Sequence, residues 1–121
     1  MKLKVSGIDA VYYTVKDIEQ ETRFYTDLLG AQPNMHWPGR LSEWTFSDGN
    51  SFGLYQTEGK DGFHSGSAMF AVDDVAKAVA EAKKNDVQFH DHGEVTETPA
   101  CHMAFGEDPE HHQFILHKRK P

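Results

Sequence analysis

The chain has 121 residues, with 12 basic and 19 acidic side chains, a net charge of -7 at pH 7 and a single cysteine. This length fits one compact domain, and the acidic balance argues against a protein that binds nucleic-acid phosphates through a basic face. One cysteine excludes an intrachain disulfide. No apolar run approaches the roughly 20 residues that span a bilayer, and the N-terminus lacks the apolar core of a signal peptide. We therefore expect a cytoplasmic protein with neither nucleic-acid nor membrane partners.

The first half of the chain predicts one helix among several strands. Asp17 is a typical helix N-cap with Gln20 as its capping-box partner, and Gly30 provides a left-handed C-terminal stop. Asp48-Gly49 is a strong hairpin signal between two strands. The strands expected in this half are residues 8–15, about 33–37, 41–47 and 51–56. The predicted order is therefore β-α-β-β-β.

The second half predicts the same order. Residues 57–66 hold three glycines among polar side chains, which is typical of a loop between two units. Asp74 is the next N-cap, and a polar loop is expected over residues 92–99. The strands expected here are residues 67–72, 87–90, 101–105 and 113–117. We interpret residues 1–121 as a single domain, with module one at about 5–57 and module two at about 66–118.

Two short matches indicate that the second module repeats the first. Val15-Lys16-Asp17-Ile18 is matched by Val72-Asp73-Asp74-Val75, and Phe52-Gly53-Leu54 by Phe114-Ile115-Leu116. A helix covers only one face of each module's sheet, so each module is left with an uncovered face. We expect the uncovered faces to form a cupped sheet around a cavity, which is a natural site for a small molecule.

These motifs resemble those of the vicinal oxygen chelate superfamily, which includes glyoxalase I, bleomycin-resistance proteins, fosfomycin-resistance enzymes and extradiol dioxygenases. The resemblance lies in Val15-x-Asp17-Ile18, in Phe24-Tyr25-x-x-Leu28-Leu29-Gly30, in residues 72–75, and in Asp108-Pro109-Glu110-His111-His112. The last stretch is a variant of the family's Asp-Pro-Asp-Gly-Asn turn. The resemblance implies an α+β fold, in which two βαβββ modules form a cupped mixed β-sheet with helices on the outer face. It also implies a homodimer.

The resemblance places four metal ligands on strands that line the cup. In this chain the corresponding residues are Ala10, Gly53, Ser67 and Ile115. Three of these side chains have no donor atom, and a lone serine is a weak ligand for a divalent ion. The pattern favours a metal-free member of the family, so no cofactor is expected.

Histidines elsewhere leave a second interpretation open. They could bind a divalent metal at an atypical site in a lyase, isomerase or dioxygenase, and whether the protein is an enzyme is therefore left open. No spacing matches a strong template such as His-Glu-x-x-His. Cys101 and His102 are adjacent in a strand, so their side chains point to opposite faces and do not make a nucleophile with its base. The candidate histidines are His64, His90, His92, His102, His112 and His117.

Strand alternation selects the residues of the ligand site. Tyr12, Thr14 and Tyr55 fall on the cavity face of module one, and a hairpin that pairs Ser47 with Asn50 would place Trp44 across from Gly53 on the same face. Module two would add Met69, Gln113 and His117, with His102 as a further candidate.

Aromatic rings, methionine and a few polar groups suit a planar or hydrophobic ligand. The leading hypothesis is a metal-free small-molecule-binding protein of the glyoxalase/bleomycin-resistance type. An alternative is a non-catalytic structural or regulatory dimer, whose cup is filled by its own aromatic side chains.

Overall fold

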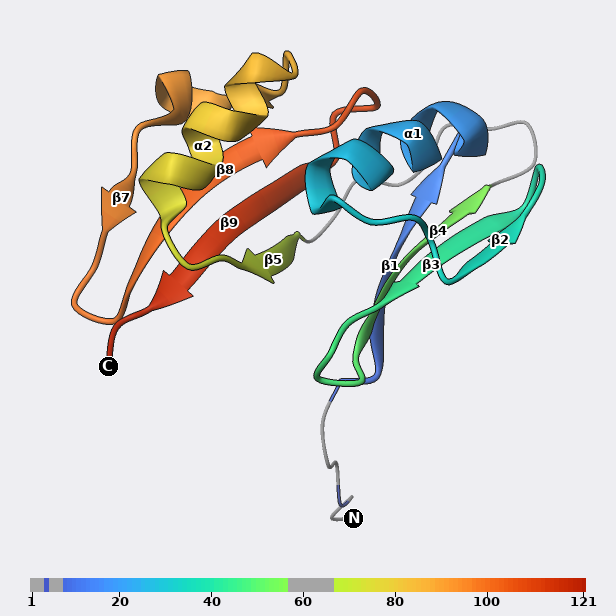
Figure 1. Ribbon diagram of the computed structural model, residues 1–121, viewed down its shortest axis with the longest axis horizontal. Coiled ribbons are helices and arrows are strands. Elements are labelled where there is room, and N and C mark those ends of the chain that lie inside the picture. The colour runs from blue at the N-terminus through green and yellow to red at the C-terminus, as the bar shows by residue number, and fades with distance from the viewer. Residues whose placement is uncertain (1–3, 5–7, 57–66) are drawn as a thin grey trace.

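The computed structural model describes residue 4, residues 8–56 and residues 67–121. The expected loop at 57–66, with His64, lies outside these residues. Module one consists of β1 (Ala10–Val15), α1 (Ile18–Leu29), β2 (Met35–Trp37), β3 (Leu41–Thr45) and β4 (Ser51–Gln56). Module two consists of β5 (Ala68–Ala71), α2 (Val75–Lys84), β6 (Gln88–Phe89), a 3-10 helix (His90–Gly93), β7 (Thr96–Glu97), β8 (Cys101–Glu107) and β9 (Gln113–Arg119). Figure 1 shows the two modules side by side.

The strands form two sheets with the same internal order. The first sheet runs β1-β4-β3-β2 and the second runs β5-β9-β8-β6, with β7 paired to β8. In each sheet the first strand of the module lies parallel to the last one. This arrangement confirms the predicted α+β class with two βαβββ modules. The polar loop expected over residues 92–99 is wrong in one respect, because Thr96 and Glu97 pair with Met103 and His102.

The helices begin where their N-cap residues predict. The Asp17 carboxylate accepts a hydrogen bond from the Gln20 N–H at 3.1 Å, and the Asp74 carboxylate accepts one from the Lys77 N–H at 3.0 Å. Gly30 ends α1 with a φ of 67°, the left-handed conformation that favours glycine. No helix among the described residues is long and apolar enough to span a membrane.

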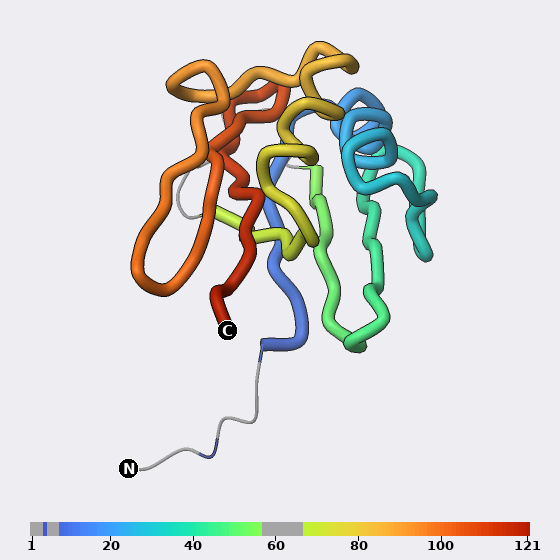
Figure 2. The backbone as a smooth tube through the Cα atoms, turned by 60° about the vertical axis from the view of Figure 1, so that its left-hand side comes forward, coloured from blue at the N-terminus to red at the C-terminus, as the bar shows by residue number. Residues whose placement is uncertain are grey.

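The core lies where the helix-covered faces of both sheets meet. The Phe70 ring of β5 lies 5.0 Å from the Phe52 ring of β4, and Phe24 of α1 lies 6.1 Å from Phe114 of β9. Figure 1 shows α1 over the first sheet and α2 over the second, and Figure 2 shows the two helices next to each other. Because the covered faces share this core, the uncovered faces are directed outward, and the described strands do not enclose one cavity between them.

The turn between β8 and β9 fastens module two to module one. The Glu110 carboxylate accepts hydrogen bonds from the N–H groups of Lys16 and Asp17, at 2.7 and 2.8 Å. Tyr13 bridges the same boundary, because its hydroxyl accepts from the Ala68 N–H at 2.6 Å and donates to the Gln113 carbonyl oxygen. The Asp-Pro turn is therefore the main polar junction between the modules.

Candidate functional site

The uncovered face of module one is built around a strand position with no side chain. The sheet register places Tyr12, Gly53 and Glu43 side by side on β1, β4 and β3. The Tyr12 ring lies directly over Gly53, where a Cβ atom would overlap it. Its hydroxyl donates to the Glu43 carboxylate. Glycine therefore lets the Tyr12 ring lie flat across the sheet and reach an acidic partner two strands away.

The Tyr12 hydroxyl keeps its proton at neutral pH. Burial, reinforced by the Glu43 carboxylate, raises the pKa of Tyr12 to about 12. The phenol therefore remains a hydrogen-bond donor throughout the physiological range. Since the carboxylate has further lone pairs, Glu43 can accept another hydrogen bond from a ligand that lies beside Tyr12.

Aromatic side chains flank the pair along the next row of the sheet. Trp37 of β2 pairs with Leu41, Leu41 pairs with Tyr55, and Tyr55 lies beside Thr14. Trp37 is 54% exposed and Tyr55 is 44% exposed. Exposed aromatic side chains on one face, next to a carboxylate, are suited to a planar ligand that carries a hydrogen-bond donor or a positive charge.

The uncovered face of module two collects three of the predicted residues. Met69 pairs with Ile115, and Gln113 and His117 lie on the same face of β9. The Gln113 side chain donates to the Ser67 hydroxyl at 2.6 Å. Met69 is 55% exposed, so this face also presents an apolar contact surface.

Two of the predicted site residues lie on the opposite, helix-covered faces. Trp44 is only 1% exposed and packs against Tyr25 of α1, with its indole N–H donating to the Ala31 carbonyl oxygen at 2.9 Å. The register pairs Trp44 with Phe52, and Glu43 takes the position beside Gly53. The placement of Trp44 on the cavity face was therefore wrong.

His102 also lies on a helix-covered face and not on the predicted cavity face. It pairs with Lys118 on β9, whereas Met103, the next residue, pairs with His117 on the uncovered face. His102 lines a depression with Val95 and the start of α2, which follows the side of β8 that the helix covers. The structure therefore brings together Tyr12, Thr14 and Tyr55 on one face and Met69, Gln113 and His117 on the other, without His102. Sequence reasoning missed Glu43 as a member of the first face.

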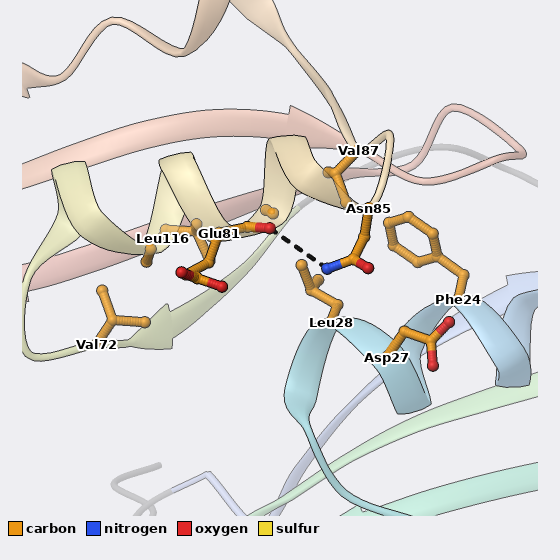
Figure 3. A pocket seen from close by; sticks show the side chains of 10 residues that line it. Phe24, Asp27, Leu28, Val72, Glu81, Asn85, Val87 and Leu116 are labelled. Carbon is orange, nitrogen blue, oxygen red and sulfur yellow. Dashed lines mark hydrogen bonds between the residues drawn. The ribbon is translucent and has the colours of Figure 1, made fainter.

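Two clefts are lined mostly by residues outside these faces. One, of about 290 Å³, separates α1 from α2 and has Phe24, Leu28 and Leu116 on its walls and the carboxylates of Asp27 and Glu81 among its lining (Figure 3). The other, of about 580 Å³, is a largely apolar groove between β5 and the β3–β4 turn. Apart from Met69, which lines the groove, none of the predicted site residues lines either cleft.

A buried polar cluster lies at the junction of the modules. The imidazole of His112 contacts the Asp108 carboxylate through Nδ1 at 2.9 Å, and Tyr25 donates to the same carboxylate at 3.0 Å. Burial opposes the charge on each of these groups. The hydrogen bonds between them nevertheless hold the pKa of Asp108 below its usual value and raise that of His112. Burial and the nearby Asp108 carboxylate raise the pKa of Glu21 well above its usual value.

The fold and the motifs agree with one family model. It describes the glyoxalase/bleomycin resistance protein/dioxygenase superfamily and matches residues 7–116. The chain belongs to this superfamily. The Asp-Pro turn and the end of α1 at Gly30, on which the resemblance was based, both lie within the matched range.

Solved structures of the superfamily share the fold at low sequence identity. A lactoylglutathione lyase from Agrobacterium tumefaciens is 15% identical with a TM-score of 0.78, and the match covers 94% of each chain. A glyoxalase/bleomycin resistance protein from Albidiferax ferrireducens is 18% identical with a TM-score of 0.76, covering 93% of this chain and 98% of that one. Another from Catenulispora acidiphila is 14% identical with a TM-score of 0.73, covering 95% and 100%. No curated protein matches the sequence at a significant level.

Proposed function

We propose that the protein binds a small planar or hydrophobic molecule, without a metal at the superfamily's usual positions. The observation that carries this proposal is the face on which Tyr12, Glu43, Trp37 and Tyr55 surround Gly53. The aromatic rings would contact the flat faces of the ligand, and the Glu43 carboxylate would accept its donor group or offset its positive charge.

The chemistry of the family's ligand positions supports a binding role over metal catalysis. Ala10 and Gly53 on module one, and Ile115 on module two, provide no donor atom for a cation. Ser67 accepts a hydrogen bond from Gln113, so its hydroxyl already has a partner. Nothing in this set favours a lyase, isomerase or dioxygenase reaction at these positions.

A second copy of the chain would complete the site. The two uncovered faces point away from each other, and both present exposed apolar side chains, with Tyr55 at 44% and Met69 at 55%. Contiguous exposed apolar surface marks an interaction site. In a homodimer the Met69 face of one copy would cover the Tyr55 face of the other, and the ligand would lie between them. A cytoplasmic location, as expected from the sequence, belongs to the same proposal.

The test combines light scattering with a ligand screen. Size-exclusion chromatography with light scattering measures the mass in solution, and equilibrium dialysis screens planar aromatic compounds, with ethidium and anilinonaphthalene sulfonate as cationic and anionic representatives. We expect a dimer that binds at least one compound, with affinity reduced tenfold or more by Tyr55→Ala. Glu43→Gln should weaken the binding of cationic compounds and leave that of anionic compounds unchanged. Lys84→Gln, on the exposed side of α2, is the control and should leave binding unchanged.

Two results would contradict the proposal. If the dimer forms but no compound binds, the protein is a structural or regulatory dimer whose uncovered faces serve only assembly. If a compound binds and Tyr55→Ala leaves its affinity intact, the ligand site lies elsewhere on the chain.

A further inference from the structure

Glu21 is a buried acidic residue without a hydrogen-bond partner. It lies on the inner side of α1 with 0% exposure, and neither carboxylate oxygen has a hydrogen-bond partner among the described residues. A buried polar group without a partner destabilises a fold. Burial and the neighbouring Asp108 carboxylate keep Glu21 protonated, and a cation bound between the two groups would replace that proton.

Glu21 belongs to a group of three side chains that could act as metal ligands. One ligand atom each of Glu21, Asp108 and His112 lies within 4.8 Å of the other two, and all three residues are buried. No other group of three histidine, cysteine or acidic side chains of this kind occurs in the part of the chain that the structure describes. The residues come from α1 and from the turn before β9, so the group joins the two modules.

The histidine is already oriented as a metal ligand would be. His112 Nε2 donates to the Thr14 carbonyl oxygen at 2.7 Å, which directs Nδ1 toward Asp108. Metal-bound histidines characteristically donate their other ring N–H to a carbonyl or carboxylate oxygen. The Asp108 carboxylate is also fixed in position, because it accepts hydrogen bonds from the Tyr25 hydroxyl and from the N–H groups of Glu110 and His112.

Distance and charge both suit a divalent cation. The His112 Nδ1 and Asp108 Oδ2 atoms are 2.9 Å apart, close to the spacing of two neighbouring ligands that each lie about 2.0–2.2 Å from one ion. After deprotonation, two carboxylates and a neutral imidazole carry a charge of -2, which one divalent ion offsets, so binding would release the protons that Glu21 and His112 hold without the ion. Glu21, whose ligand atom lies within 4.8 Å of the other two, would complete a three-residue set, with water as a further ligand.

We propose that Glu21, Asp108 and His112 bind one divalent transition-metal ion at the junction of the modules. One imidazole with two carboxylates suits zinc, and the imidazole disfavours magnesium and calcium. The site lies on the helix-covered side, away from Ala10, Gly53, Ser67 and Ile115, so it is independent of the ligand face. Its role would be to hold the 108–112 turn against α1.

The experiment uses the full chain without an affinity tag. The protein is stripped with a chelator, dialysed and titrated with zinc, and metal content and affinity are measured for the parent and three variants. Glu21→Gln and His112→Asn remove one ligand each. His111→Asn is the matched control, because His111 is an exposed histidine in the same turn with a φ of 69°, which asparagine tolerates. Circular dichroism verifies that each variant is folded.

The expected result is one zinc per chain in the parent and in His111→Asn, with zinc affinity reduced tenfold or more in Glu21→Gln and His112→Asn. The proposal is overturned if the parent binds no stoichiometric zinc, or if the two ligand variants bind as tightly as the control. Should a ligand variant fail to fold, imidazole nitrogen NMR of the parent decides. Zinc must shift the His112 Nδ1 signal while Nε2 keeps its proton, and an unshifted Nδ1 overturns the site.

Discussion

His112 donates a hydrogen bond from Nε2 to the Thr14 carbonyl oxygen at 2.7 Å, although 98 residues separate the two in sequence. The same imidazole is stacked on the Tyr13 ring, with the ring centres 5.0 Å apart and the planes 9° from parallel. Both contacts join the last turn of module two to the first strand of module one. The stability of the whole domain should therefore depend on the polar groups at this junction.

The Tyr25 hydroxyl should contribute measurably to stability. It is fully buried and donates at 3.0 Å to the Asp108 carboxylate. Tyr25→Phe leaves that charged group with one hydrogen bond fewer, so we expect a loss of about 1.5–3 kcal/mol in the free energy of unfolding. Urea denaturation followed by circular dichroism measures this loss. Tyr55→Phe, at an exposed position, should change it by less than about 0.5 kcal/mol, and equal effects of the two variants would contradict the role of the Asp108 bond.

Adding a methyl group at Gly53 should disrupt the Tyr12–Glu43 pair. A Cβ atom there overlaps the Tyr12 ring, so Gly53→Ala must move the ring off the sheet or strain the strand. We expect a loss of stability of about 1–3 kcal/mol, as for other overpacked sites. In a Tyr12→Ala background the three atoms nearest to the added Cβ are removed, so the same substitution should cost much less. A double-mutant cycle by urea denaturation gives the coupling, and strictly additive effects would show that the ring does not depend on Gly53.

The alkaline titration of Tyr12 should be separable from that of an ordinary tyrosine. Burial and Glu43 raise its pKa to about 12 in the folded protein, whereas an unfolded tyrosine titrates near 10. The folded state therefore holds this proton more tightly, and the stabilising effect present below pH 10 is lost as the pH rises from about 10 to about 12. The difference in phenolate absorbance between the parent and Tyr12→Phe isolates this residue. A midpoint near 10 would contradict the Glu43 interaction, and Glu43→Gln should lower the midpoint.

The two tryptophans should respond very differently to a soluble quencher. Trp44 is 1% exposed, whereas Trp37 is 54% exposed. Acrylamide should quench Trp37 emission readily and leave a blue-shifted component from Trp44. Stern–Volmer plots of the parent and of Trp37→Phe measure the two components. Strong quenching that persists in Trp37→Phe would show that Trp44 is accessible, as the original sequence-based placement required.

Strand alternation predicted one face well and misplaced Trp44 for an identifiable reason. The faces of Tyr12 and Thr14 follow from alternation along β1 alone, and no turn enters that prediction. The predicted face of Trp44 depended on the pairing of residues in the hairpin. The prediction paired Ser47 with Asn50, whereas in the structure Thr45 pairs with Ser51. Gly49 adopts a φ of 86°, and its N–H donates to the Phe46 carbonyl oxygen, so the loop is longer than a two-residue turn. That one-residue shift in register moves every side chain of β3 to the other face.

The junction could not be predicted from local pattern. His112 was named as one of several candidate metal ligands and as part of a variant turn, without its partners, and Asp17 was paired with Gln20 alone. The partners of His112 and Glu110, at Thr14 and at Lys16, lie in the other module. Strand and helix periodicity carry no information about such contacts, because they depend on how the two modules pack together. A buried position for Glu21 on α1 was the one local signal, since Ile18 and Tyr25 on the same helix side are also buried.

The junction also dictates the order in which the molecule can reach its native state during synthesis. A growing chain completes α1 and β1 before residues 108–112 are synthesised, so the Tyr25 hydroxyl and the Thr14 carbonyl have no partners at Asp108 and His112 until then. Domains generally fold as units during translation, and here the unit closes only when the final turn has emerged. A premature stop before Asp108 would therefore release a chain whose first module has every strand and helix of its own but lacks the contacts that fix it in place.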